Sequence, residues 1–186
     1  MRIYLAGPEV FLPDAVSAGE NKKRICAAFG CTGVYPLDNS LDLSDIRGPE
    51  AGYAIYKANR ELMDSCDAVI ANLTPFRGPS ADAGTVFELG YMRGAGKRIA
   101  AYTNVAQPYA DRVRHLDPDA RQESDAVWRD GEGMLVEEFG LSDNLMLEGA
   151  LRDGGMALVM FAAPANTRFT DLTAFARCLE LVRDVV

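Results

Sequence analysis

Residues 67–92 read DAVIANLTPFRGPSADAGTVFELGYM and combine three local patterns. The run DAVIANLTP, residues 67–75, is typical of a buried strand, and a loop punctuated by glycine and proline follows it. A helix is then expected to begin around Ser80–Ala81 and to end at Gly94. A buried strand that leads through a loop into a helix is the repeating unit of parallel α/β sheets. This stretch therefore predicts an α/β fold.

The same unit recurs along the chain. Further strands are expected in residues 2–8, 31–38, 97–104 and 155–164, and further helices in residues 13–30, 53–66, 142–154 and 170–186. Five strands alternating with helices predict a doubly wound five-stranded parallel sheet of flavodoxin-like order, covered on both faces. Residues 39–52 are expected to be a loop. The charge-rich segment from 104 to about 140 is expected to be an excursion or lid, which leaves residues 1–186 as a single domain.

Composition narrows the classes of function. The chain has 186 residues and a formal net charge of −8, and no basic stripe offsets the acid, which argues against partners such as nucleic acid or anionic membranes. No apolar run is long enough to span a bilayer. The four cysteines show no metal-ligand spacing, so we expect buried thiols in a reducing cytoplasm. His115 is the only histidine, so we expect no metal or other cofactor, and acid–base chemistry depends mainly on carboxylates.

Three side chains are candidates for that chemistry at the carboxyl edge of the sheet, where sites of doubly wound folds lie. Glu88 stands inside the predicted helix on a face of small and apolar residues, where a carboxylate needs a partner or a function. Asp82 stands near the start of this helix, where an alternative role is interaction with the helix dipole. Tyr4 lies on the first strand, and an ordinary core position is its alternative. Asn59 is a poor helix former in the middle of a predicted helix.

Three blocks of sequence together resemble nucleoside 2-deoxyribosyltransferases: RIYLAGPEVFLPDA at residues 2–15, the stretch at 67–92 and DNLML at 143–147. The resemblance implies that Glu88 is the nucleophile, that Asp82 helps to protonate or orient the base, and that Tyr4 holds the Glu88 carboxylate. Asn144 and Met146 would reach the active site of a neighbouring subunit, which implies a homo-oligomer built from dimers. Some members have Asp at the position of Asn59, and the proton-transfer role of that Asp is not carried over.

The implied reaction moves 2-deoxyribose from a deoxynucleoside donor to a free nucleobase acceptor, through a glycosyl-enzyme ester and with retention at C1′. A carboxylate can stabilise and capture the oxocarbenium-like centre that forms when the glycosidic bond breaks. We expect Phe11, Phe76 and Met146 to exclude water and stack the base, although both phenylalanines could equally be packing residues. Gly7, Asn59, Gly78 and Ser80 complete the expected substrate site.

Two alternatives remain open. A glycosidase that hydrolyses 2′-deoxynucleoside 5′-monophosphates would need a phosphate site, which Arg77, Gly78 and Ser80 could form, although Glu9 in the first loop is expected to repel a phosphate. A non-catalytic nucleotide-binding module is the other alternative. The GTVFE segment also resembles the GTxxE signature of cytokinin-activating phosphoribohydrolases, but the PGG that should precede the signature is absent, so that interpretation fails.

Overall fold

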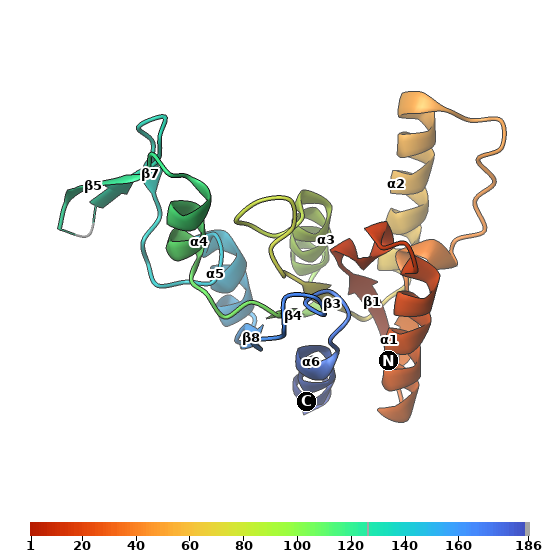
Figure 1. Ribbon diagram of the computed structural model, residues 1–186. Helices are drawn as coiled ribbons and strands as arrows, with labels where there is room; N and C mark the ends of the chain where they lie inside the picture. The colour runs from red at the N-terminus through yellow and green to blue at the C-terminus, as the bar shows by residue number, and fades with distance from the viewer. Residues whose placement is uncertain (126, 185–186) are drawn as a thin grey trace.

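The computed structural model describes residues 1–125 and 127–184, and its centre is a five-stranded parallel sheet (Figure 1). The strands run in the order β2-β1-β3-β4-β8, and every neighbouring pair is parallel. Their bounds are β1 (Arg2–Ala6), β2 (Thr32–Val34), β3 (Ala68–Asn72), β4 (Arg98–Thr103) and β8 (Val159–Met160). The sequence prediction of a flavodoxin-like α/β fold is confirmed.

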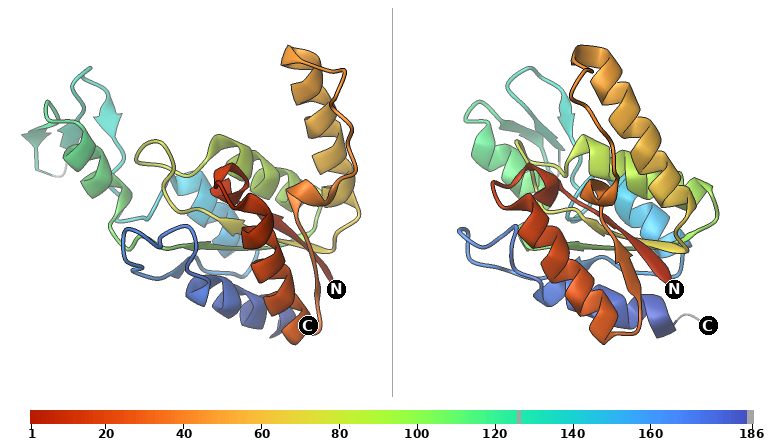
Figure 2. Two further views of the ribbon diagram at one scale, coloured as in Figure 1. Left: turned by 45° about the vertical axis from the view of Figure 1, so that its right-hand side comes forward. Right: turned by 90° about the vertical axis from the view of Figure 1, so that its right-hand side faces the viewer.

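Helices cover both faces of this sheet, as Figure 2 shows. α1 (Ala15–Ala28) and α6 (Thr173–Asp184) lie on one face, and α2 (Gly48–Asp64), α3 (Ala83–Gly94) and α5 (Leu145–Asp153) lie on the other. Strand alternation divides β1 between the two cores: Ile3 and Leu5 pack with α1 and α6, whereas Tyr4 packs with α2, α3 and α5. All four cysteines are buried and free, as expected. In the part of the chain that the structure describes, no helix is both long and apolar enough to cross a membrane.

α2 differs from the sequence prediction because it begins at Gly48, five residues before the expected start at Tyr53. The segment GPEAG looks like a turn in sequence, but Pro49 stands in the first turn of the helix, where its missing N–H breaks no hydrogen bond. The early start makes α2 long, and its first turns extend beyond the edge of the sheet (Figure 1). The last five residues of the predicted loop, 48–52, are therefore helical.

Residues 104–140 also have more structure than a simple excursion. They contain α4 (Tyr109–Leu116) and a second, antiparallel sheet of β5 (Arg121–Ser124), β6 (Val127–Arg129) and β7 (Leu135–Val136). This small sheet projects away from the central one (Figure 1). The last parallel strand is shorter than predicted, because only Val159 and Met160 pair with β4. Two 3₁₀ turns, η1 (Pro8–Phe11) and η2 (Pro36–Asp38), follow β1 and β2 and end at the same edge of the sheet.

Candidate active site

A cleft of about 380 Å³ opens at the carboxyl edge of the sheet, beside the turns η1 and η2 and between α2 and α3. The strand order reverses between β1 and β3, and the crevice beyond such a reversal is where doubly wound folds bind ligands. Most of its wall is apolar and comes from η1, from the loop that follows β2 and from Ile55 of α2. The polar side chains that line it are Asn39, Asn59, Asp82, Thr85 and Glu88.

Tyr4 and Glu88 meet at the floor of this cleft. The Tyr4 side chain is fully buried, and its hydroxyl donates a 2.7 Å hydrogen bond to Oε1 of Glu88. Burial raises the pKa of the Glu88 carboxyl from its ordinary value of 4.5 to about 7; the Tyr4 hydrogen bond opposes this rise, and the negative charge of Asp82 adds to it. Burial and the Glu88 charge raise the pKa of Tyr4 well above its ordinary value of 10, so Tyr4 stays a donor at neutral pH.

Asp82 both caps α3 and lines the cleft. It is the N-cap of α3, because its Oδ2 accepts hydrogen bonds from the Thr85 backbone N at 2.9 Å and from Thr85 Oγ1 at 3.0 Å. Its side chain also lines the cleft beside Glu88. Gly84 keeps this corner open, because a Cβ there would lie 3.1 Å from Asp82 Oδ2. Among the described residues, no hydrogen bond engages Asp82 Oδ1.

Gly7 lines the cleft directly after β1, and the reason for a glycine is Glu9. A Cβ at Gly7 would lie 2.0 Å from Glu9 Oε2. The Glu9 side chain turns inward and is 1% exposed; it pairs with Lys22 and accepts hydrogen bonds from Asn72 Nδ2 at 2.9 Å and from the Tyr102 hydroxyl at 3.0 Å. The expectation that Glu9 would repel a phosphate is therefore wrong, because its charge is buried and paired.

The two candidate phenylalanines stack on each other, with ring centroids 5.2 Å apart and an angle of 13° between the planes. Phe11 lines the cleft and is 55% exposed. Phe76 is not part of the lining and packs against Phe169 behind Phe11. Asn59, from α2, lines the cleft, and its Oδ1 is buried without a hydrogen-bond partner in the described chain. An unpaired buried acceptor at a cleft wall is suited to a donor on a ligand.

With this geometry in place, comparison with known proteins identifies the family. The family model described as nucleoside 2-deoxyribosyltransferase matches residues 3–146, a range that includes Tyr4, Asp82 and Glu88. The chain belongs to the nucleoside 2-deoxyribosyltransferase family.

Individual proteins similar to this chain include two solved structures and one curated sequence. A solved 2-desoxiribosyltransferase from Leishmania mexicana is 27% identical, with a TM-score of 0.65, and the match covers 100% of this chain and 99% of that one. An uncharacterised protein of Schizosaccharomyces pombe is 35% identical, and the match covers 92% of this chain and 88% of the relative. A conserved protein from Enterococcus faecalis shares the fold, at 18% identity and a TM-score of 0.54, over 97% of this chain and 98% of the other.

Other residues expected in the site of this deoxyribosyltransferase-family protein lie outside the cleft. Gly78 lines a different pocket, and the Ser80 hydroxyl donates to Asp143, which ties the loop before α3 to the start of α5. Asn144 caps α5 through its Oδ1, which accepts from the Met146 backbone N at 3.0 Å. Met146 is 70% exposed. The contribution of Asn144 and Met146 to a neighbouring site stays a prediction.

Sequence reasoning missed the loop after β2, which supplies Leu37, Asn39, Leu41 and Leu43 to the cleft. One signal could have found it: all parallel strands of a doubly wound sheet end at one edge, so the loop after the second strand lies beside the loop after the first. The described residues contain no group of three or more side chains placed to hold a metal ion.

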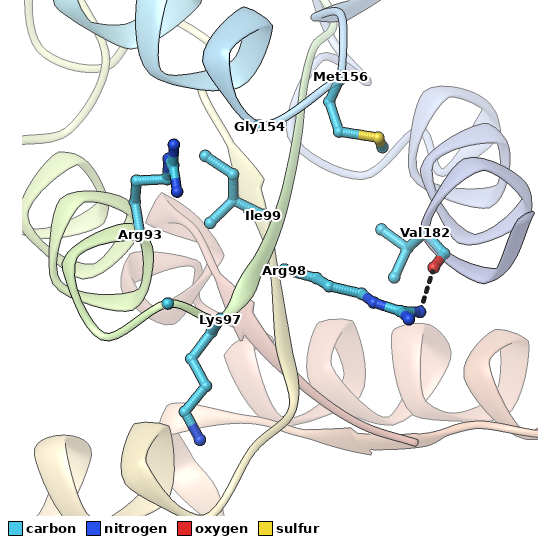
Figure 3. Close-up of a pocket in the computed structure, with 8 residues that line it drawn as sticks. Arg93, Lys97, Arg98, Ile99, Gly154, Met156 and Val182 are labelled. Atoms are coloured by element: carbon cyan, nitrogen blue, oxygen red, sulfur yellow. Dashed lines mark hydrogen bonds between the residues drawn. The ribbon is translucent and has the colours of Figure 1, made fainter. Parts of the chain in front are cut away.

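A smaller pocket of about 140 Å³ lies beside the start of β4, at the edge of the sheet opposite the cleft (Figure 3). Three cations line it, and the protein itself engages all of them. The Arg98 guanidinium donates to the Val182 carbonyl at 3.4 Å, Lys97 Nζ donates to the Cys66 carbonyl at 2.7 Å, and Arg93 pairs with Asp153. With no carboxylate in its lining and its cations occupied, this pocket is a poor candidate for the family's chemistry.

Proposed function

We propose that the protein transfers 2-deoxyribose from a deoxynucleoside to a free nucleobase, with Glu88 as the nucleophile. The observation that supports this most is the Tyr4–Glu88 hydrogen bond at the floor of a largely apolar cleft. A carboxylate with a pKa of about 7 retains basicity, and at neutral pH a substantial fraction of it is ionised and can attack carbon. The family supports the same chemistry, since its name describes this transfer.

In the first step, a carboxylate oxygen of Glu88 attacks C1′ on the face opposite the base. The bond between C1′ and the base nitrogen breaks, its electron pair leaves with the base, and a proton reaches the base on the side of Asp82. In the second step, a nitrogen of the acceptor base attacks C1′ of the ester, the bond between C1′ and the Glu88 oxygen breaks, and the acceptor gives up its N–H proton on the side of Asp82, which replaces the proton delivered in the first step. Two inversions give retention. A 2-deoxy sugar favours this route, because no 2′-hydroxyl withdraws electrons from C1′.

The surroundings of the nucleophile support transfer over hydrolysis. Leu37, Leu41 and Leu43 and the exposed ring of Phe11 form an apolar wall that can exclude water from the ester until a base arrives. Asn59, with its unpaired Oδ1, is placed to bind a donor group of the substrate.

Hydrolysis of 2′-deoxynucleoside 5′-monophosphates is the second candidate. Glu9 was expected to repel the phosphate of such a substrate, but its side chain is buried and paired with Lys22, so its charge does not face the cleft. The lining argues against it, since no lysine or arginine of the described chain lines the cleft and Ser80 is bonded to Asp143. A phosphate would therefore lack the cationic partners that such a group normally receives. A non-catalytic nucleotide-binding module is the third candidate, and the hydrogen bond that fixes Glu88 through the buried Tyr4 argues against it.

The proposed assembly is a homo-oligomer built from dimers, in which Asn144 and Met146 reach the cleft of a neighbouring subunit. One observation supports it: Met146 is 70% exposed although it is apolar. The Asn144 side chain is engaged within its own subunit, because its Oδ1 accepts from the Met146 backbone N and its Nδ2 donates to Glu137, so its part in the neighbouring cleft requires these hydrogen bonds to be exchanged. Exposed aromatic rings lie on neighbouring helices as well: the ring centroids of Tyr56 on α2 and Phe87 on α3 are 6.2 Å apart, and the two residues are 41% and 51% exposed. Apolar surface of this kind is typical of protein interfaces.

Product analysis tests the proposed function. The protein is incubated with deoxyuridine or deoxyinosine together with adenine, and the products are separated by chromatography. Deoxyadenosine identifies a transferase, free deoxyribose alone identifies a hydrolase, and neither product identifies a binding module. Glu88→Ala should abolish activity, whereas Glu61→Ala, which removes an exposed glutamate from α2, is the matched control and should keep it.

A further inference from the structure

We propose that a second pocket, outside the glycosyl-transfer cleft, binds a phosphate group. This basic pocket has a volume of about 440 Å³ and lies between the loop after β3, the loop after β4, α4 and the segment before α6. Its cationic lining consists of Arg77, Arg112 and Arg168, joined by His115, and no acidic side chain of the described chain lines it. Such a concentration of positive charge is unexpected in a chain with a net charge of −8.

Arg77 and Arg168 are the side chains available to a ligand. Both are exposed, and neither forms an ion pair with an acid in the described part of the molecule. Each guanidinium lies over an aromatic ring: Arg77 is 4.6 Å from the centroid of Phe76, and Arg168 is 4.8 Å from that of Phe169. The two rings pack edge to face at 6.1 Å. Stacking holds both guanidinium groups in place, so less conformational entropy is lost when they bind a ligand.

Arg112 forms the buried side of the basic pocket. It is 6% exposed, its Nε donates to the Pro79 carbonyl at 2.7 Å, and its guanidinium lies 3.6 Å from Asp143. These contacts fix the shape of the pocket and leave its mouth to Arg77, Arg168 and His115. Planar guanidinium groups suit the oxygen atoms of a phosphate, because they donate two parallel hydrogen bonds. The ligand class that fits is therefore inorganic phosphate or the phosphate of a nucleotide.

The basic pocket is separate from the cleft that contains Glu88. The two linings share no residue of the described chain, and the stacked rings of Phe11 and Phe76 lie next to both: Phe11 lines the cleft, and the Arg77 guanidinium of the basic pocket lies 5.1 Å from the Phe11 ring and 4.6 Å from the Phe76 ring. It also differs from the pocket in Figure 3, where the protein engages every cation. Phosphate binding here can be measured without turnover, so it does not depend on the proposed function.

The test is a titration followed by amide NMR shifts of the ¹⁵N-labelled protein, with three probes: inorganic phosphate, adenosine 5′-monophosphate and, as the phosphate-free control, adenosine. Inorganic phosphate should shift the Gly78 amide saturably. Loss of one guanidinium in Arg168→Ala or Arg77→Ala should weaken binding roughly tenfold or more. Arg152→Ala removes an exposed arginine elsewhere, on α5, and should leave the affinity unchanged. Glu88→Gln should also leave it unchanged.

The relative affinities for the three probes distinguish the possible ligands. A nucleotide that binds more tightly than inorganic phosphate identifies a nucleotide as the ligand, and equal affinities identify the phosphate group alone. No saturable shift, or an affinity for phosphate that Arg168→Ala leaves unchanged, would overturn the proposal. A gain of phosphate affinity in Glu88→Gln would also overturn it, because removal of the Glu88 negative charge strengthens the binding of an anion only if that anion lies in the cleft. Arg168→Glu provides a second variant, for which binding should be undetectable.

Discussion

The hydroxyl of Tyr4 donates a 2.7 Å hydrogen bond to the carboxylate of Glu88, across 84 residues of sequence. The parallel sheet makes this contact possible, because β1 and β3 are neighbours and α3 follows β3 back across the same face. Tyr4 is fully buried and Glu88 borders the cleft, so the bond links the core of the protein to the proposed site of chemistry.

Tyr4→Phe should lower kcat by about tenfold to a hundredfold, because it removes the donor that orients the nucleophile. The Tyr4 hydrogen bond opposes the rise in the pKa of Glu88, so its loss should move the acidic limb of the kcat/KM profile to higher pH. Tyr35→Phe is the matched control, because Tyr35 is a buried tyrosine whose hydroxyl has no hydrogen-bond partner in the described chain. An acidic limb that stays in place in Tyr4→Phe would contradict the assigned role.

The pH dependence of the wild-type protein follows from Glu88. The nucleophile must be ionised, and burial raises its pKa to about 7, so kcat/KM should rise with pH through about 7 and then level off. Steady-state kinetics at subsaturating donor between pH 5 and pH 9 measure this limb. A limb near the ordinary carboxyl value of 4.5 would show that Glu88 is solvated in the working enzyme.

The raised pKa of Glu88 also makes the stability of the folded protein depend on pH, and here a higher pH is unfavourable. The folded protein holds the Glu88 proton more tightly than the unfolded chain, so ionisation of Glu88 costs folding free energy that is absent below pH 4.5 and fully present above about pH 7. Glu88→Gln removes this cost and should stabilise the protein at pH 8 by on the order of 2 kcal/mol, with little effect at pH 4. Urea denaturation at the two pH values tests this. Equal effects at both values would exclude the linkage.

Asp82 can be divided into its two roles by substitution. Asn is as good an N-cap as Asp, so Asp82→Asn should change the free energy of unfolding by less than about 0.5 kcal/mol while activity falls. Asp82→Ala should lose activity and also about 1 kcal/mol of stability, because the Thr85 backbone N–H then loses its cap. Denaturation and base-exchange rates measured on both variants provide the comparison. Full activity in Asp82→Asn would show that the Asp82 carboxylate is not needed for base exchange and that Asp82 acts only as the N-cap of α3.

The buried pair of Lys22 and Glu9 predicts a large stability effect. Both side chains are 1% exposed, and Lys22→Met would leave the Glu9 charge without its partner, at a cost of roughly 3–5 kcal/mol. The double variant Lys22→Met/Glu9→Gln should recover much of this loss, because Gln can still accept from Asn72 and Tyr102. Denaturant unfolding of the single and double variants measures the coupling. A double variant as unstable as the single one would show that lost packing, not charge, dominates.

The sequence was most informative where local patterns were strong. Buried strands such as residues 67–75 indicated the fold class. Strand alternation put Tyr4 on the face opposite Ile3 and Leu5, and the structure shows that α3 covers the Tyr4 face. An acid within an apolar helix face indicated Glu88 correctly as a cleft residue. Each of these inferences depends on the residue itself and its near neighbours.

The features that the sequence did not predict depend mainly on contacts between segments that are far apart in the chain. The early start of α2 at Gly48 was hidden, because glycine and proline also mark turns. Glu9 looked like an exposed loop acid, and only Lys22, thirteen positions later on α1, reveals that it is buried. Ser80 looked like a ligand-binding residue, but Asp143, far along the chain, accepts its hydroxyl. No local pattern identifies such partners.

The central proposal is that Glu88 forms a covalent ester with the sugar, and peptide mass spectrometry tests it most directly. The protein is mixed with deoxyuridine without an acceptor base, quenched in acid within a turnover and digested. We predict a deoxyribosyl group on the peptide that contains Glu88, lost when adenine is added before the quench and absent from Glu88→Gln. Turnover with retained configuration but with the adduct on another peptide, or an active Glu88→Gln, would contradict the account.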